Sequence, residues 1–148
     1  MVDLSRLGAV FTGTEPYVVS RAKIREFADA VGAEAAWHHD PGAGVAAGYA
    51  DVLAPPTFAV VIAQRAESEY IADPASGIDF SRVVHANESF SFDRPLVAGD
   101  IISTEVHVDS LTERAGITMV TTRTEMTDAD GAHVASVVST LAVRGEGR

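Results

Sequence analysis

The chain of 148 residues contains no cysteine, which excludes disulfide bonds. No apolar run approaches the roughly 18 residues that a membrane-spanning helix needs. The N-terminus, Met1-Val2-Asp3-Leu4-Ser5, lacks the basic start and apolar centre of a signal peptide. We therefore expect one domain over residues 1–148, in a cytoplasmic protein.

Positive charge is scarce, because 11 Lys and Arg residues stand against 21 Asp and Glu residues, for a net charge of −10. This balance argues against nucleic acid or an anionic membrane surface as the main partner. Docking of an acidic carrier protein would require a local basic patch. The scattered candidates for such a patch are Arg65, Arg82, Arg94, Arg114 and Arg123.

Two helices are predicted after an irregular segment 1–16 and a short β-prone run at 17–19. Ser20 is a candidate N-cap and Gly32 a candidate C-terminal residue of the first helix. Between them, apolar residues recur at helical spacing: Ile24, Phe27, Ala28 and Val31. This pattern is typical of a short helix that lies on a core.

The second predicted helix begins at Pro55-Pro56 and ends near Ala72, since proline is tolerated in a first helical turn. Every residue from 58 to 63 is apolar, so this half should be buried on all sides. After Gln64 the helix becomes amphipathic, and we expect three charged residues to point outward: Arg65, Glu67 and Glu69.

Four strands are predicted over residues 83–92, 101–111, 116–126 and 132–143. In the first of them, one side carries Val84, Ala86, Phe90 and Phe92, interrupted by Glu88, and the other side carries His85, Asn87, Ser89 and Ser91. The order of elements predicts an α+β fold, with an antiparallel sheet wrapped around a long central helix.

Several short motifs resemble the MaoC-like dehydratase and R-specific enoyl hydratase family. The loop of active members reads G-D-x-N-P-x-H-x-D-P, and here it aligns with 32–41. In this alignment His38 matches the family histidine, whereas Ala33 stands where the family has its aspartate. Further matches are Ala47-Gly48-Tyr49, the run 53–58, Arg82-Val83-Val84-His85, Phe90-Ser91-Phe92, Arg94-Pro95 and Ala98-Gly99-Asp100.

The resemblance covers nearly the whole chain and implies a single hot-dog fold. Its sharpest part is the active loop, and the further matches resemble the N-terminal, FAS1-like subgroup, which includes substrate-binding subunits of actinobacterial (3R)-hydroxyacyl-ACP dehydratases. Dehydration removes an α-proton and expels hydroxide, which requires a base and a positioned acid. His38 is the catalytic candidate for the base, but Ala33 supplies no acid. The chain alone is therefore expected to be a poor catalyst.

The expected ligand is a fatty-acyl thioester on acyl carrier protein or coenzyme A, with no metal or redox cofactor. The candidate substrate-binding residues are Trp37, Pro56, Thr57, Phe58, His85 and Asn87. Purely structural roles are the alternatives: Trp37 would be a core or interface residue, and His85 and Asn87 would make cross-strand hydrogen bonds. The run His38-His39-Asp40 is a weak metal motif, because adjacent loop side chains rarely converge.

These features favour a protomer that pairs with another hot-dog protomer, since one sheet around one helix leaves an open edge. The partner would be either a catalytic hot-dog subunit or a second copy. Two rival hypotheses are a self-sufficient homodimeric hydratase that uses His38 with Glu34 or water, and an acyl-thioester binding or sensing module. A thioesterase is disfavoured, because no acidic residue precedes Glu67 on the predicted central helix.

Overall fold

The computed structural model describes residues 1–145, so the last three residues of the predicted domain lie outside the described part. Within it, the elements are η1 (Leu4–Arg6), β1 (Val10–Thr12), β2 (Tyr17–Val18), α1 (Arg21–Val31), η2 (Ala36–His38), α2 (Pro41–Ala46), η3 (Pro56–Phe58), α3 (Ala59–Ala72), η4 (Pro74–Ser76), η5 (Phe80–Arg82), β3 (Val83–Phe92), β4 (Ile101–Arg114), β5 (Ile117–Thr127) and β6 (His133–Arg144).

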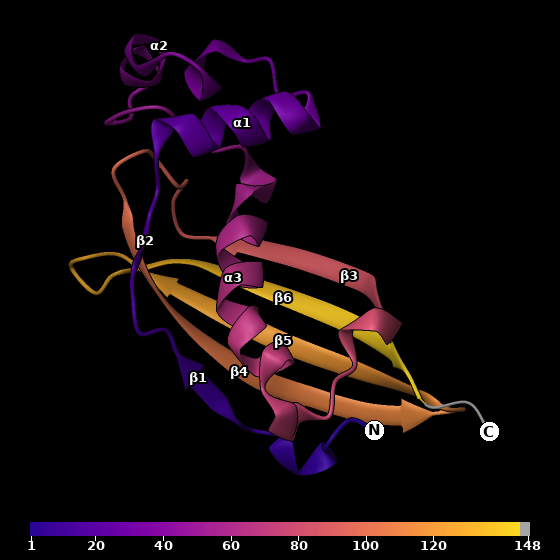
Figure 1. Ribbon diagram of the computed structural model, residues 1–148. Coiled ribbons are helices and arrows are strands. Elements are labelled where there is room, and N and C mark those ends of the chain that lie inside the picture. The colour runs from indigo at the N-terminus through magenta and orange to yellow at the C-terminus, as the bar shows by residue number, and fades with distance from the viewer. Residues whose placement is uncertain (146–148) are drawn as a thin grey trace.

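The strands of the described chain form an antiparallel sheet in the order β1-β4-β5-β6-β3, and β2 pairs with the start of β4. The long strands β4, β5 and β6 twist together beneath α3, which lies along one face of the sheet (Figure 1). This arrangement confirms the predicted α+β fold, with an antiparallel sheet around a long helix. The predicted start at Pro55-Pro56 is a 3-10 turn that leads directly into α3.

Helix α1 lies across the N-terminal end of α3, with α2 above it (Figure 1). Ser20 caps α1 by accepting a hydrogen bond from the Lys23 backbone, and Gly32 ends it in the left-handed conformation, as predicted. Ile24 and Ala28 are buried, but Val31 is 52% exposed, so the predicted stripe is one turn shorter than expected. This layer positions the loop 33–53 next to the start of α3.

Apolar side chains fill the space between α3 and the sheet in two clusters. One surrounds the N-terminal half of α3 and includes Phe58 and Ile62, and the other surrounds Tyr70 near its C-terminal end. Between the two clusters lies a group of buried polar side chains, here called the polar belt: Glu67, Thr122, Thr124 and Ser139. The core is therefore interrupted by polar groups at the middle of α3.

Three sequence predictions about the strands are wrong in part. The segment 1–16 contains β1, a three-residue strand held by pairing with Glu105–His107 on β4, which no local pattern announces. The predicted sides of β3 fail at its start, since a bulge between His85 and Asn87 shifts the phase. Val84 is therefore 66% exposed, while Glu88 faces inward with the phenylalanines of β3. In addition, β4 extends three residues beyond the predicted 101–111.

Phe58 lies at the entry to the central helix and is fully buried. Its ring centroid is 5.5 Å from that of Phe27, and the two rings are nearly perpendicular. We expect Phe58→Ala to lower the free energy of unfolding by about 3–5 kcal/mol, because it leaves a cavity in the core. Urea unfolding followed by circular dichroism measures this loss. Phe80→Ala is the matched control, since Phe80 is 70% exposed and its loss should change stability by less than about 0.5 kcal/mol.

No helix of residues 1–145 is both long enough and apolar enough to span a membrane.

Candidate functional site

The loop between α1 and α3 holds the His38 ring on both sides. Its Nδ1 lies 2.7 Å from the Leu53 carbonyl oxygen, which fixes the proton on Nδ1. The lone pair of Nε2 then accepts a hydrogen bond from the Trp37 indole N–H at 3.2 Å. The imidazole is buried, at 8% exposure. Both ring nitrogens are thus engaged inside the chain, so neither is free to take a proton from a ligand in this arrangement.

Ala33, which stands where the family has its aspartate, makes only a backbone contact in this region. Ala33 offers only its carbonyl oxygen, which accepts a hydrogen bond from His39 Nε2 at 2.9 Å. Glu34, the rival candidate, is exposed. Within the described part of the chain, no ion pair or hydrogen bond joins His38 to a carboxylate. The acid–base pair that dehydration requires is therefore not assembled by this chain.

A cavity of about 480 Å³ opens beside His38 at the start of α3. Its walls are the loop, the entry to α3 and the end of β3 with the turn that follows. Its lining residues are Trp37, His38, Leu53, Ala54, Pro55, Pro56, Phe92, Asp93, Arg94, Pro95 and Leu96. The walls are mainly apolar, as a site for an acyl group requires.

The structure separates the six predicted substrate-binding residues into four groups. Trp37 and Pro56 line the cavity beside His38, and His85 lines a second cavity further along α3. Phe58 is fully buried in the core. Thr57 and Asn87 are exposed and line neither cavity. The predicted set therefore does not form one site.

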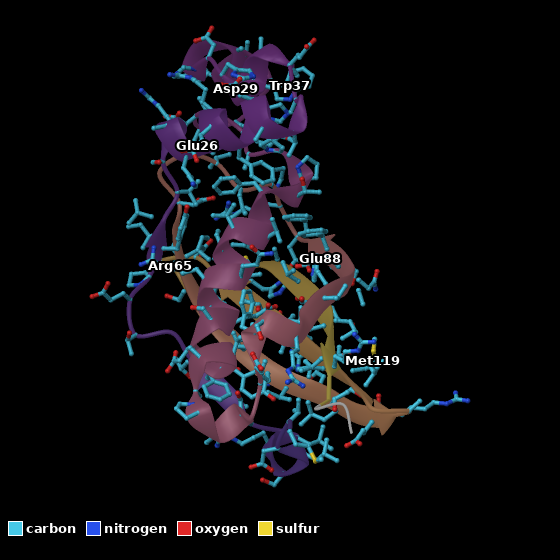
Figure 2. All side chains as sticks on the ribbon, turned by 45° about the vertical axis from the view of Figure 1, so that its right-hand side comes forward. Glu26, Asp29, Trp37, Arg65, Glu88 and Met119 are labelled. Atoms are coloured by element: carbon cyan, nitrogen blue, oxygen red, sulfur yellow. The ribbon has the colours of Figure 1, made fainter. Side chains whose placement is uncertain are left out.

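The second cavity, of about 510 Å³, lies between the C-terminal half of α3 and the edge formed by β3 and β6. Five apolar residues line it, Ile71, Ala72, Phe80, Val83 and Leu141, with Gln64 and Ser68 at α3. Three polar side chains also reach it: Glu67, His85 and Ser139. The first cavity is lined by Pro55 and Pro56, before α3, and the second by α3 from Gln64 onward, so the two cavities lie at different heights along the helix. Figure 2 shows the labelled Glu88, which neighbours the second cavity through His85, below Trp37 of the first cavity.

Glu67 contradicts the sequence prediction that it points outward, because it is only 2% exposed. The spacing explains the burial: Glu67 follows Ala63 by four residues and precedes Tyr70 by three, and both of these are fully buried. That i, i+4, i+7 relation was the signal that could have identified it. Reasoning from its charge alone assigned it to the solvent.

The pKa of Glu67 rises from 4.5 to about 7, chiefly because the carboxyl group is buried and in part because of the nearby charge of Glu88. A hydrogen bond donated by the Thr122 hydroxyl to Oε1, at 2.9 Å, opposes this rise. The carboxyl group is therefore largely protonated below neutral pH. In that state it can both donate and accept hydrogen bonds.

The bulge in β3 brings His85 to the same cluster. Its Nε2 lies 2.5 Å from Glu88 Oε2, an ion-pair contact whose geometry is not that of a hydrogen bond, and 3.3 Å from the Ser139 hydroxyl. Without the inserted residue at the bulge, His85 would face away from the helix. The bulge is thus the local feature that completes the polar wall of the second cavity.

The five arginines considered for carrier docking are mostly occupied elsewhere. Arg94 pairs with Asp100 and Asp128, and Arg123 pairs with Asp109 and Glu125. Arg82 contacts Asp79, and the Arg65 guanidinium lies over the Tyr17 ring. Because four of the five have local partners in different parts of the fold, they do not form a common basic patch.

Gly44 allows the loop to pack closely, since a Cβ at this position would lie 2.2 Å from the Asp51 carbonyl oxygen. We expect Gly44→Ala to lower the free energy of unfolding by about 1–3 kcal/mol, because α2 must move away from the 51–52 backbone. The single tryptophan, Trp37, reports on this loop in urea unfolding followed by fluorescence. Gly42→Ala is the matched control, since the nearest atom to its Cβ would be at an ordinary 3.5 Å.

Comparisons with known proteins identify relatives of this sequence and of this fold. The sequence profile of the FAS1-like dehydratase domain region matches residues 5–137. A UPF0336 protein of Saccharopolyspora erythraea is 46% identical over 144 residues, which are 97% of this chain and 92% of that protein.

Among solved structures, one chain of the C-terminally truncated HadBC complex, a (3R)-hydroxyacyl-ACP dehydratase of Mycobacterium tuberculosis, is similar with a TM-score of 0.85. It is 28% identical, over 95% of this chain and 97% of that chain. A MaoC-like dehydratase has a TM-score of 0.88 and 30% identity, over 95% of this chain but 43% of that longer chain.

The sheet wrapped on α3 is therefore a hot-dog fold of the dehydratase class. Within this class, the chain belongs to the FAS1-like dehydratase family. The resemblance inferred from the motifs is confirmed.

Proposed function

We propose that the chain is the substrate-binding, non-catalytic subunit of a (3R)-hydroxyacyl thioester dehydratase in fatty-acid metabolism. Its acyl group would be carried by acyl carrier protein or coenzyme A, and its place of action would be the cytoplasm. Similarity to a chain of the HadBC complex, named as a (3R)-hydroxyacyl-ACP dehydratase, supports the reaction class. The catalytic Asp/His pair would come from a partner subunit.

One observation carries the non-catalytic role: the state of the His38 ring. Its two nitrogens are engaged by Leu53 and Trp37, and Ala33 provides no acid. A general acid or base is typically worth about 10²–10⁴ in rate. A chain that lacks the acid, and whose candidate base is already hydrogen-bonded on both sides, should bind substrate without transforming it.

The open edge of the sheet supports the partner. Strand β3 pairs only with β6 within residues 1–145 and so leaves ten residues of unpaired edge. Val84 on this strand is 66% exposed. An exposed strand edge is an aggregation hazard unless another chain covers it. We therefore propose that a second hot-dog protomer adds its own strand to β3, either a catalytic subunit or a second copy.

Turnover of a 3-hydroxyacyl or enoyl thioester by the purified chain tests this function. We expect no turnover above the uncatalysed rate, although the same thioester should bind, because the cavity beside His38 is present and the acid–base pair is not. His38→Ala is the control variant, since it removes the remaining candidate base.

Two outcomes would oppose the proposal in different ways. Robust turnover that His38→Ala abolishes would make the chain a self-sufficient hydratase. A stable homodimer that binds acyl thioesters without turnover, and that forms no complex with a hot-dog chain carrying the intact Asp-x-Asn-Pro-x-His loop, would make it a binding or sensing module.

A further inference from the structure

The second cavity is lined by both apolar and polar side chains, which is unusual for a site that would hold an alkyl chain. Among the polar ones, Glu67, His85 and Ser139 belong to α3, β3 and β6 respectively. Glu67 and Ser139 are each only 2% exposed. Burying such groups beside an alkyl chain costs free energy unless they find hydrogen-bond partners. A wall of this kind therefore fits a ligand with a polar group at that point.

Hydrogen-bonding capacity next to the cavity is left unused. Both carboxylate oxygens of Glu88 are buried; Oε2 is engaged by the ion-pair contact with His85, whereas Oε1 has no partner within residues 1–145. The Thr124 hydroxyl, which is fully buried in the polar belt, also has no partner in this part of the chain. Buried polar groups in native proteins are nearly always satisfied. The cluster that links Glu88 to the cavity through His85 thus keeps hydrogen-bonding capacity that residues 1–145 do not use.

We propose that the second cavity binds an acyl chain that carries a hydroxyl group, with Glu67, His85 and Ser139 holding that hydroxyl. A hydroxyl group donates one hydrogen bond and accepts others, so it matches a cluster of carboxyl, imidazole and hydroxyl groups. A carboxylate ligand is disfavoured, because it would meet the charge of Glu88. The ligand class is therefore a hydroxylated acyl chain rather than a plain alkyl chain.

This inference rests on the proposed function, in which an acyl thioester enters near the start of α3. Glu67 lies eight residues after Ala59, a rise of roughly 12 Å along the helix. The first cavity borders Phe92 at the end of β3, and the second borders His85 near the start of the same strand. An acyl chain whose thioester lies in the first cavity, and which extends along β3, would bring its distal part, and not its thioester, to Glu67.

Binding of two matched probes tests the inference. The probes are a saturated acyl N-acetylcysteamine thioester long enough to span that distance, and the same chain with a hydroxyl group near its far end. Titration calorimetry measures the affinity of each probe for the protein in the oligomeric form in which it purifies. We expect the hydroxylated probe to bind about tenfold more tightly, which is the effect of one or two net hydrogen bonds.

Variants of the wall identify the residues responsible. Glu67→Leu should reduce the preference for the hydroxylated probe to within about twofold. Ser139→Ala should also weaken this preference, although it leaves the Glu67 carboxyl group in place. Glu67→Gln should keep most of it, because an amide also donates and accepts. Glu69→Gln is the control, since Glu69 is an exposed carboxylate on the same helix.

The outcomes separate this inference from the proposed function. Equal affinity of both probes for the unmodified protein would overturn the hydroxyl site and leave acyl binding intact. Failure of both probes to bind would overturn the two proposals together. A preference that survives in both Glu67→Leu and Ser139→Ala would contradict the assignment of the polar wall.

Discussion

Replacing Glu67 by glutamine should stabilise the protein above neutral pH and should remove a large part of the pH dependence of its stability. The pKa of Glu67 rises from 4.5 to about 7 in the folded chain, chiefly because the carboxyl group is buried. Below pH 4.5 such a group does not lower the free energy of unfolding, because it is protonated in both the folded and the unfolded chain. As the pH rises through 4.5 to 7, the unfolded chain loses this proton first, so the free energy of unfolding falls.

The expected size of this effect is about 3 kcal/mol, since each pKa unit corresponds to about 1.4 kcal/mol. Urea unfolding of the unmodified protein and of Glu67→Gln at pH values from 4 to 8.5 measures it. The difference between the two proteins isolates Glu67 from other titrating groups, such as Glu125, whose pKa is lowered to about 2, and His133, whose pKa is raised. Glu69→Gln is the matched control. A constant difference across this pH range would show that Glu67 is not buried as a neutral acid.

A complex with a catalytic hot-dog subunit should dehydrate a 3-hydroxyacyl thioester at least about 100-fold faster than this chain alone. That factor is the lower end of what a general acid or base contributes, and the partner would supply both groups. Initial rates of the separate chains and of their mixture, at equal concentrations, measure the gain.

The control is a partner variant whose loop aspartate is changed to alanine. The mixture should then fall back to the level of this chain alone. A complex that forms but is no faster than this chain alone would contradict the subunit hypothesis. If no complex forms and this chain still binds the thioester, the result would favour a binding module.

Local signals in the sequence predicted much of the fold. Ser20 and Gly32 bound α1 as expected, because the cap and the left-handed terminus are decided within a few residues. Along β4, Ile102, Val106 and Val108 recur in one phase of the strand, and all three are buried on its inner face. These features depend on neighbours in the chain, which a sequence displays directly.

Features decided by distant parts of the chain were missed. β1 exists because β4 offers it an edge, and the bulge in β3 arises in its pairing with β6. Glu67 was assigned to solvent by its charge, although Thr122 on β5, 55 residues away, donates a hydrogen bond to it. At His38, the motif indicated the missing acid at Ala33. Only the folded loop brings the Leu53 carbonyl oxygen to the ring.

The most direct measurement of the central claim is the activity of the two-subunit dehydratase when this chain carries His38→Ala. Because the His38 ring is already engaged by Trp37 and Leu53, and because Ala33 supplies no acid, the reaction should run on the partner's groups. We expect the initial rate at saturating substrate to stay within about twofold of the unmodified complex. A fall of about 100-fold or more, with the complex still assembled, would place catalysis in this chain and contradict its role as a binding subunit.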